Sequence, residues 1–289
     1  MDAASTGPTV RGPRRPRISL RAMLMVVLFL GCSLGWLVHR ARVQRAAVDS
    51  VDRVRGEVLY EWEYKDGKYI PGGKSWWPRW LVSVLGVDYL ESVARVIVTQ
   101  DGSDAVLDKI SGLSRLEELI FTSSSPTDGG LARLGGLTGL RYLDLSKSGV
   151  SDAGLSHLGG LTGLRWLIVK NCPIGDTGLA HIRGLTRLEG LGLNGTGITD
   201  AGLMHLKGLS GLKNLYFTGT RIGDGGLAHL EGLEGLQLLY LNHTEITDGG
   251  LRHLRGLKRL KYLNLEGTRV TDAGVQELRK ALPNAKIVP

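Results

Sequence analysis

Leucine residues recur at a constant spacing along the C-terminal part of the chain. The first leucine of each unit lies 24 residues after the previous one, at Leu116, Leu140, Leu164, Leu188, Leu212, Leu236 and Leu260. A fixed period of this length predicts a solenoid, in which each unit buries its apolar side chains against its neighbours. We therefore expect a repeat domain over residues 93–289, with seven full units from residue 116, a degenerate first unit and a truncated last one.

Alternating positions within a unit predict a β-strand. In the unit that begins at residue 140, Leu143 and Leu145 should point into the core, while Tyr142 and Asp144 point outward. Strands of successive units should then pair side by side in one parallel sheet. A hydroxyl or thiol group follows each strand, as at Thr196, where it can bond the turning backbone.

Each unit then carries the signals of a short helix. In the unit from residue 188, Thr199 is a favourable N-cap and Asp200 places a negative charge in the first helical turn. The helix should run to about Leu206, and Gly208 should end it. The last unit breaks this pattern, and Ile287 is predicted to lie in register with Leu263 in a short final strand.

The consensus L-x-x-L-x-L-x-x-(T/S/C)-x-(I/V)-(T/S/G)-D-x-G-L-x-x-L resembles the leucine-rich repeat. That resemblance implies an α/β solenoid with a parallel sheet on its concave face and short helices on its convex face. The T-D-x-G-L motif is similar to that in the repeats of F-box-associated proteins. Because no F-box-like helical module precedes the repeats, the resemblance does not imply a ubiquitin-ligase role. The layout of the whole chain resembles bacterial single-span, membrane-anchored leucine-rich-repeat proteins, which implies a location and a fold but no ligand.

The N-terminal segment suggests that anchor. Residues 1–18 are basic and proline-containing, and predict a disordered tail. Residues 22–38 are uncharged and mostly apolar, which predicts a transmembrane signal anchor over residues 19–39. A cleaved signal peptide is the alternative, although no small-x-small site follows. Five arginines lie close to each end of the span, so flanking charge does not decide its orientation, and the role of an N-terminal apolar segment in export favours repeats outside the cytoplasm.

The net charge of the chain is concentrated near the N-terminus. Residues 1–55 hold ten arginines and three aspartates and so carry +7 of the formal +8, which leaves the repeats nearly neutral. A nucleic-acid-binding solenoid would need a basic stripe to neutralise phosphates. We therefore expect no nucleic-acid partner.

Residues 40–92 are predicted to join the anchor to the repeats. Apolar spacing indicates a helix over residues 40–54, alternation indicates a strand over residues 57–64, and a short helix is expected over residues 78–85. Three tryptophans, Trp76, Trp77 and Trp80, fall close together. We interpret them as a cap on the first edge of the solenoid core; a membrane-interface contact or a ligand platform is the alternative.

Two repeated columns could carry chemistry. One is formed by histidines, at His157, His181, His205, His229 and His253, and the other by the aspartates of the helix starts. Equivalent positions on packed helices are about 8–10 Å apart, too far to share one metal ion, and the aspartates lack the short-range clustering of calcium loops. No nucleophile, phosphate-binding or zinc motif is present in the sequence. We predict no enzyme activity, no metal and no cofactor.

The outward strand positions are the better candidate for function, because large aromatic and aliphatic side chains recur there. On the concave face we expect a partner-binding surface, formed by Tyr142, Asp144, Trp166, Ile168, Lys170, Asn194, Tyr216, Leu238, Tyr240, Asn242, Tyr262 and Asn264. Gly190 and Gly192 should leave a bare notch midway. The alternative is that the rings only cover the sheet and pack on one another.

Two functions fit these observations. The first is a membrane-anchored protein–protein interaction module, and the second is a structural component of the envelope that self-associates through its repeats. Neither the identity of the partner nor the oligomeric state follows from the residues.

Overall fold

The structure is a computed structural model that describes residues 20–65, 68–71, 73–100, 103–122 and 125–289. The chain divides into two compact units, residues 1–40 and residues 41–289. The predicted basic tail, residues 1–18, lies outside the described residues.

Helix α1 (Leu20–Arg53) occupies the segment in which the sequence predicts a membrane span. In the first unit its large apolar side chains are exposed, including Met25, Phe29 and Trp36. Among the residues that the structure describes, however, no helix combines the length and the apolar character needed to cross a membrane.

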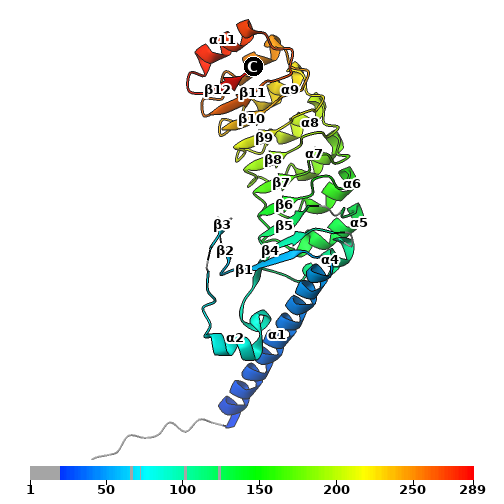
Figure 1. Ribbon diagram of the computed structural model, residues 1–289, viewed down its shortest axis with the longest axis vertical. Helices are drawn as coiled ribbons and strands as arrows, with labels where there is room; N and C mark the ends of the chain where they lie inside the picture. Colours follow the sequence, from blue (N-terminus) through cyan, green and yellow to red (C-terminus); the bar gives the residue numbers. More distant parts are fainter. Residues whose placement is uncertain (1–19, 66–67, 72, 101–102, 123–124) are drawn as a thin grey trace, which may run out of the picture. The chain divides into compact units, whose positions relative to one another are not determined.

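The second unit is the predicted solenoid. Ten strands of its described residues form one sheet in the order β1-β4-β5-β6-β7-β8-β9-β10-β11-β12 (Figure 1). All neighbours from β4 onward are parallel, whereas β1 pairs with β4 in the antiparallel sense. The strands are β1 (Glu57–Tyr60), β4 (Val93–Val98), β5 (Glu118–Phe121), β6 (Tyr142–Asp144), β7 (Trp166–Ile168), β8 (Gly190–Gly192), β9 (Asn214–Tyr216), β10 (Leu238–Tyr240), β11 (Tyr262–Asn264) and β12 (Lys286–Val288). β2 (Tyr64–Lys65) and β3 (Lys68–Tyr69) pair separately.

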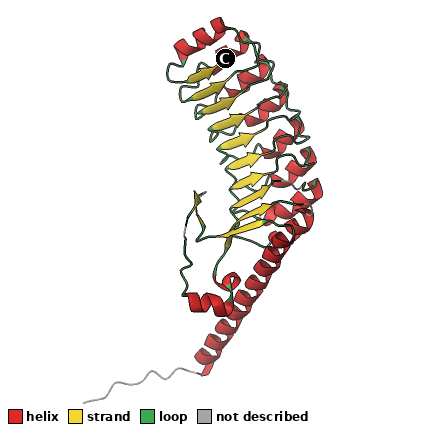
Figure 2. Ribbon diagram, viewed as in Figure 1, coloured by secondary structure: helices red, strands yellow, loops and turns green. Residues whose placement is uncertain are grey.

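Short helices follow the strands and line the other side of the core (Figure 2). They are α4 (Ser103–Ile110), α5 (Asp128–Leu131), η1 (Ala132–Gly136), α6 (Asp152–Leu155), η2 (Ser156–Leu158), α7 (Asp176–Ile182), α8 (Asp200–Leu203), η3 (Met204–Leu206), α9 (Asp224–Leu227), η4 (Ala228–Leu230), α10 (Asp248–Leu251), η5 (Arg252–Leu254) and α11 (Asp272–Ala281). The predicted helix to Leu206 is thus one α-helical turn continued by a 3₁₀ turn, a common ending for a short helix.

The main core is one continuous apolar cluster that runs from Ala47 to Ile287, and Leu59, Tyr64 and Ala94 form a second, small cluster. Leu143 and Leu145 are completely buried, as the alternation predicts. Leu263 pairs with Ile287, so the predicted register of the last strand is confirmed. The threonine column also behaves as predicted: Thr196 Oγ1, for example, donates to the carbonyl of Leu193 at 2.6 Å.

The recurring aspartate has a role beyond the helix to which it belongs. Asp176 accepts hydrogen bonds from the backbone N–H of Thr199, at 2.8 Å, and from its hydroxyl, at 2.6 Å. Thr199 is the N-cap of α8 in the next repeat. A Cβ added at Gly202 would lie only 2.4 Å from Oδ1 of the same carboxylate. Each aspartate therefore links its own repeat to the helix start of the next one.

These hydrogen bonds form a ladder from repeat to repeat, and they account for the residue types in the T-D-x-G part of the motif. Aspartate-to-cap hydrogen bonds join every successive pair of repeats from Asp104 to Thr271. The threonine or serine donates hydrogen bonds to the aspartate carboxylate of the preceding repeat. The aspartate in turn accepts hydrogen bonds from the cap residue of the following repeat. The glycine has no side chain and so leaves room for the carboxylate of the preceding repeat.

In two repeats the cap is a glycine, Gly175 or Gly223, whose N–H donates to the aspartate of the preceding repeat. Beside Gly175, the hydroxyl of Thr177 also donates to Asp152.

The first edge of the core is sealed by α1 and β1. Ala47 and Val51 of α1 are fully buried in the core, and Gln44 Nε2 donates to the backbone carbonyl of Glu91 at 2.7 Å. β1 covers the free edge of β4, with Val58 opposite Val96. Two further helices, α2 (Arg79–Leu85) and α3 (Val87–Leu90), precede β4.

The prediction that the tryptophan cluster caps the core is wrong. Trp76 is 93% exposed, Trp77 45% and Trp80 66%, and α2 buries none of its side chains. The reason is that Ala47 and Val51 of α1, together with β1, already occupy this edge of the core.

Candidate partner-binding surface on the sheet

The side of the sheet that faces away from the helices carries the predicted partner-binding residues, and we call it the sheet face. Most of them come from strands β6, β7, β9, β10 and β11, and Lys170, Asn194 and Asn242 follow β7, β8 and β10. Their neighbours in each strand, such as Leu143 and Leu215, are buried in the core. Lys170 is exposed, and the other eleven predicted residues are half-buried. The structure therefore brings the predicted set onto one surface.

Aromatic rings on the sheet face form two clusters. Tyr216 and Tyr240 stack with ring centroids 5.0 Å apart, and Tyr240 and Tyr262 follow at 5.1 Å. Such pairs add attraction beyond the area that they bury. In the second cluster, Tyr142 and Trp166 lie 6.5 Å apart. Each cluster is a preordered apolar platform of adjacent rings.

The predicted notch at Gly190 and Gly192 is filled. A Cβ on Gly190 would lie 2.2 Å from Cε3 of Trp166, and one on Gly192 would lie 3.0 Å from Cγ2 of Ile168. Both glycines are buried as a result. The missing side chains of β8 thus let the neighbouring side chains of β7 lean over it, which extends an apolar surface across the strand.

Two tyrosines of the sheet face, Tyr142 and Tyr216, have a raised pKa and keep their hydroxyl protons at physiological pH. Burial, helped by the nearby charge of Asp144 and then of Glu118, raises the pKa of Tyr142 to about 12. Burial and the neighbouring Tyr240 also raise the pKa of Tyr216. A neutral phenol can donate a hydrogen bond to a partner while its ring supplies apolar contact.

Several predicted polar residues are partly engaged within the sheet face. Asn194 Oδ1 accepts the backbone N–H of Thr218 at 3.0 Å, and Asn242 Oδ1 accepts the hydroxyl of Thr218 at 2.8 Å. Asp144 likewise accepts both the N–H and the hydroxyl of Ser146. These side chains are held in place by their neighbours, so they lose little freedom when a partner docks.

Sequence reasoning missed two residues of this surface. Asn214 is half-buried and stands in register with Leu238, and Thr218 lies between the two asparagines that it joins. The repeat period offered a signal for Asn214, since it occupies the same position as Tyr142 and Trp166. Thr218 has no such signal, because its importance comes from the hydrogen bonds that it makes across strands.

The histidine column does not form a shared site. In the described part of the chain, no group of three or more His, Cys, Asp or Glu residues is arranged to hold a metal ion. His253 Nδ1 pairs with Glu231 at 2.5 Å, whereas Nδ1 of His229 is buried without a hydrogen-bond partner among the described residues. His229 and His253 therefore have different surroundings, although they occupy the same repeat position.

Comparisons with known proteins identify the repeats. Residues 137–159 and 210–270 each match a family model described as a leucine-rich repeat. A comparison with curated proteins gives no significant match.

Among solved structures, internalin C2 of Listeria monocytogenes is similar with 22% identity and a TM-score of 0.52, over 71% of this chain and 82% of that protein. This likeness shows the fold. A leucine-rich-repeat protein of Leptospira interrogans has 19% identity and a TM-score of 0.48, over 62% of this chain, and the match spans 50% of that protein. The plant peptide hormone receptor RGFR1, in complex with RGF2, has 14% identity and a TM-score of 0.44, over 63% of this chain and 29% of the receptor.

Proposed function

We propose, since this chain is a leucine-rich-repeat protein, that it is a protein-binding module whose sheet face receives the partner. The observation that carries the proposal is the half-exposed stack of Tyr216, Tyr240 and Tyr262 across three adjacent strands. Tyrosine is among the residues that most often dominate binding energy at interfaces. Repeat domains also offer such extended surfaces without needing a cavity.

Rigid packing supports this role over that of a simple cover. Each ring of the stack is held by its neighbour at about stacking distance, and Lys286 Nζ lies 5.9 Å from the centroid of Tyr262. Side chains that are already ordered add contact area at a low entropic cost. The phenol hydroxyls of these rings can give a partner directional hydrogen bonds in addition to apolar contact.

Membrane anchoring is a further part of the proposal. The apolar run of residues 22–38 and the exposure of its described large side chains support an anchor in that segment. The orientation that we propose places the repeats on the extracytoplasmic side, because long C-terminal domains follow an N-terminal export signal largely regardless of flanking charge. Proximity labelling from the C-terminus tests this topology, and labelling of cytoplasmic proteins alone would contradict it.

The test of the binding function uses a double variant, Tyr216→Ala with Tyr240→Ala. Loss of two central aromatic contacts should weaken partner capture from membrane extracts by about 30-fold or more, given about 2 kcal/mol or more for a residue that dominates an interface. Tyr69→Ala is the matched control, because Tyr69 is 59% exposed and lies in β3, outside the sheet face. All variants should keep the far-UV spectrum of the parent protein.

Two results would count against the proposal. Capture that is equal for the double variant and the parent protein would remove the sheet face from the interaction. If light scattering shows that the molecular mass of the particle rises with protein concentration, and no other protein is captured, the result would instead favour the self-associating envelope component.

A further inference from the structure

A cavity of about 310 Å³ lies beside the first strands of the sheet, and none of the predicted sheet-face residues lines it. Three of its lining residues are glutamates, Glu61, Glu91 and Glu117, and three are aromatic, Trp62, Tyr64 and Trp76. Among the residues that the structure describes, no lysine, arginine or histidine lines the cavity. Its size lies at the lower end of the range for small-ligand sites. The combination of aromatic walls and glutamates, one of which has no ion pair among the described residues, points to a cation.

Among the described residues, Glu91 is the one glutamate of the three that has no ion-pair partner. The residue is only 8% exposed, and its carboxylate accepts the hydroxyl of Ser75 at 2.5 Å. It forms no ion pair with any residue that the structure describes. A positive group in the cavity would give this carboxylate an ion pair.

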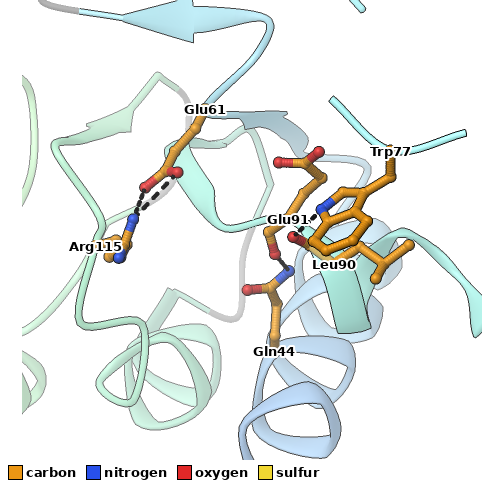
Figure 3. Close-up of polar contacts among 6 residues, drawn as sticks. All are labelled: Gln44, Glu61, Trp77, Leu90, Glu91 and Arg115. Carbon is orange, nitrogen blue, oxygen red and sulfur yellow. Dashed lines mark hydrogen bonds and ion pairs between the residues drawn. The ribbon is translucent and has the colours of Figure 1, made fainter. Parts of the chain in front are cut away.

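The other two glutamates show which kind of positive group the region accepts. Glu61 accepts a hydrogen bond from Nη1 of Arg115 at 3.1 Å. Figure 3 draws this pair together with Glu91 and its neighbours. Oε2 of Glu117 lies 3.6 Å from Nη1 of Arg141. Both partners are guanidinium groups that approach from outside the lining of the cavity.

Two lining residues hold polar atoms that the fold leaves unsatisfied. Nε1 of Trp62 and Oε2 of Glu117 are buried and have no hydrogen-bond partner among the described residues. An unmade buried hydrogen bond is unfavourable, so a group of this kind in a native structure calls for a partner. Oε2 of Glu117 has the guanidinium of Arg141 at 3.6 Å as its ion-pair partner. Nε1 of Trp62 is the atom that still lacks a partner among the described residues.

Trp76 gives the cavity an aromatic wall that the fold itself does not use. It is 93% exposed although it is a large apolar residue, and the core is sealed without it. A guanidinium group stacks on such rings, is only weakly hydrated, and matches carboxylates with its planar set of donors. The chain already contains this arrangement nearby, since Arg95 Cζ lies 5.4 Å from the ring centroid of Tyr64 while its Nε lies 3.4 Å from Glu118.

We propose that the cavity binds the guanidinium group of an arginine side chain presented by a peptide or protein partner. A divalent metal is a poorer match, because the carboxylates of the described residues do not converge as metal ligands. A quaternary ammonium is poorer too, because it has no N–H group to donate to the carboxylate of Glu91. The site is separate from the tyrosine stack, so each can succeed or fail without the other.

The test titrates the full chain with three blocked tripeptides by calorimetry: Gly-Arg-Gly, Gly-Lys-Gly and Gly-citrulline-Gly. Citrulline has the shape of arginine without its charge. Saturable binding of the arginine peptide is expected, with the citrulline peptide weaker by at least about tenfold and the lysine peptide weaker by several-fold, since hydrogen bonds to charged groups and stacking favour guanidinium. Free spermidine serves as a fourth probe and should bind more weakly than the arginine peptide.

Variants then locate the binding. Glu91→Gln and Glu117→Gln should each weaken the arginine peptide by about tenfold, because each removes one charged partner. Glu189→Gln is the matched control, since Glu189 occupies the same repeat position as Glu117, three repeats further on, and does not line the cavity. Thermal unfolding checks that each variant is folded.

Four results would overturn the proposal: no saturable binding of the arginine peptide, equal binding of the citrulline peptide, equal binding of lysine peptide or spermidine, or equal weakening by Glu189→Gln. The comparison of peptides on the parent protein needs no variant, so a variant that fails to fold leaves the test intact.

Discussion

The aspartate ladder predicts that the effect of a glycine substitution on the free energy of unfolding depends on an aspartate one repeat away. In the parent protein, a Cβ added by Gly202→Ala would lie 2.4 Å from Oδ1 of Asp176. The carboxylate must move, and it then loses good geometry in its hydrogen bonds to the N–H and hydroxyl of Thr199. Overpacking of this kind costs about 1–3 kcal/mol. The better helix propensity of alanine offsets up to about 1 kcal/mol of that cost.

Removing the carboxylate changes the outcome. Asp176→Ala alone should lower the free energy of unfolding by about 2 kcal/mol, because it removes two half-exposed, charge-assisted hydrogen bonds and a favourable charge at a helix start. In that background the nearest atom to the new Cβ is Cα of Asp176 at 3.3 Å, a contact that a small shift relieves. Gly202→Ala should then be nearly neutral. The two changes should therefore couple by about 1–2 kcal/mol.

The assay is urea unfolding of the four proteins of the double-mutant cycle, followed by far-UV circular dichroism. In thermal scans, each 1 kcal/mol corresponds to about 2–4 °C for a domain of this size. Because repeat proteins are stabilised by nearest-neighbour interfaces, hydrogen exchange should show the loss at the junction of α7 and α8 first. Equal destabilisation by Gly202→Ala in both backgrounds would refute the role that we assign to the ladder.

Three further predictions follow from the same geometry. Leu215→Ala should lower the free energy of unfolding by about 2–5 kcal/mol in urea titrations, because Leu215 is completely buried in the centre of the sheet, and a loss below about 1 kcal/mol would contradict the tight packing. The hydrogen bonds from Thr271 hold the pKa of Asp248 below its ordinary value. The parent protein should therefore melt above Asp248→Ala at neutral pH, and this difference should shrink as the pH falls through the lowered pKa of Asp248; a difference that stays constant down to that pH would contradict the linkage. Gly190→Val should displace the indole of Trp166 and weaken partner capture while Leu215 stays buried, as seen by an altered near-UV spectrum with unchanged far-UV signal; an unchanged near-UV spectrum would contradict the close approach.

Much of the fold could be read from the chain because its information is local and repeated. The period of the leucines predicts the stacking, and alternation predicts which side chains of β6 to β11 lie on each side of the sheet. Tyr142 and Tyr216 therefore fall on the sheet face as expected, since a side chain's direction within a strand depends only on its position in that strand. The residue-level signals for the N-caps succeeded for the same reason, as Thr199 and Thr247 show.

Features that depend on a neighbouring repeat or on the end of the stack required the tertiary structure. Asp176 looks like a simple helix-start charge in the sequence, yet its partner is Thr199 in the next repeat. Trp166 fills the space over Gly190, which sequence reasoning left as a notch. The tryptophan at position 76 stays exposed because Val51 and β1 reach the core edge first. Periodicity determines where each side chain points, but only packing in three dimensions decides which other side chain it meets.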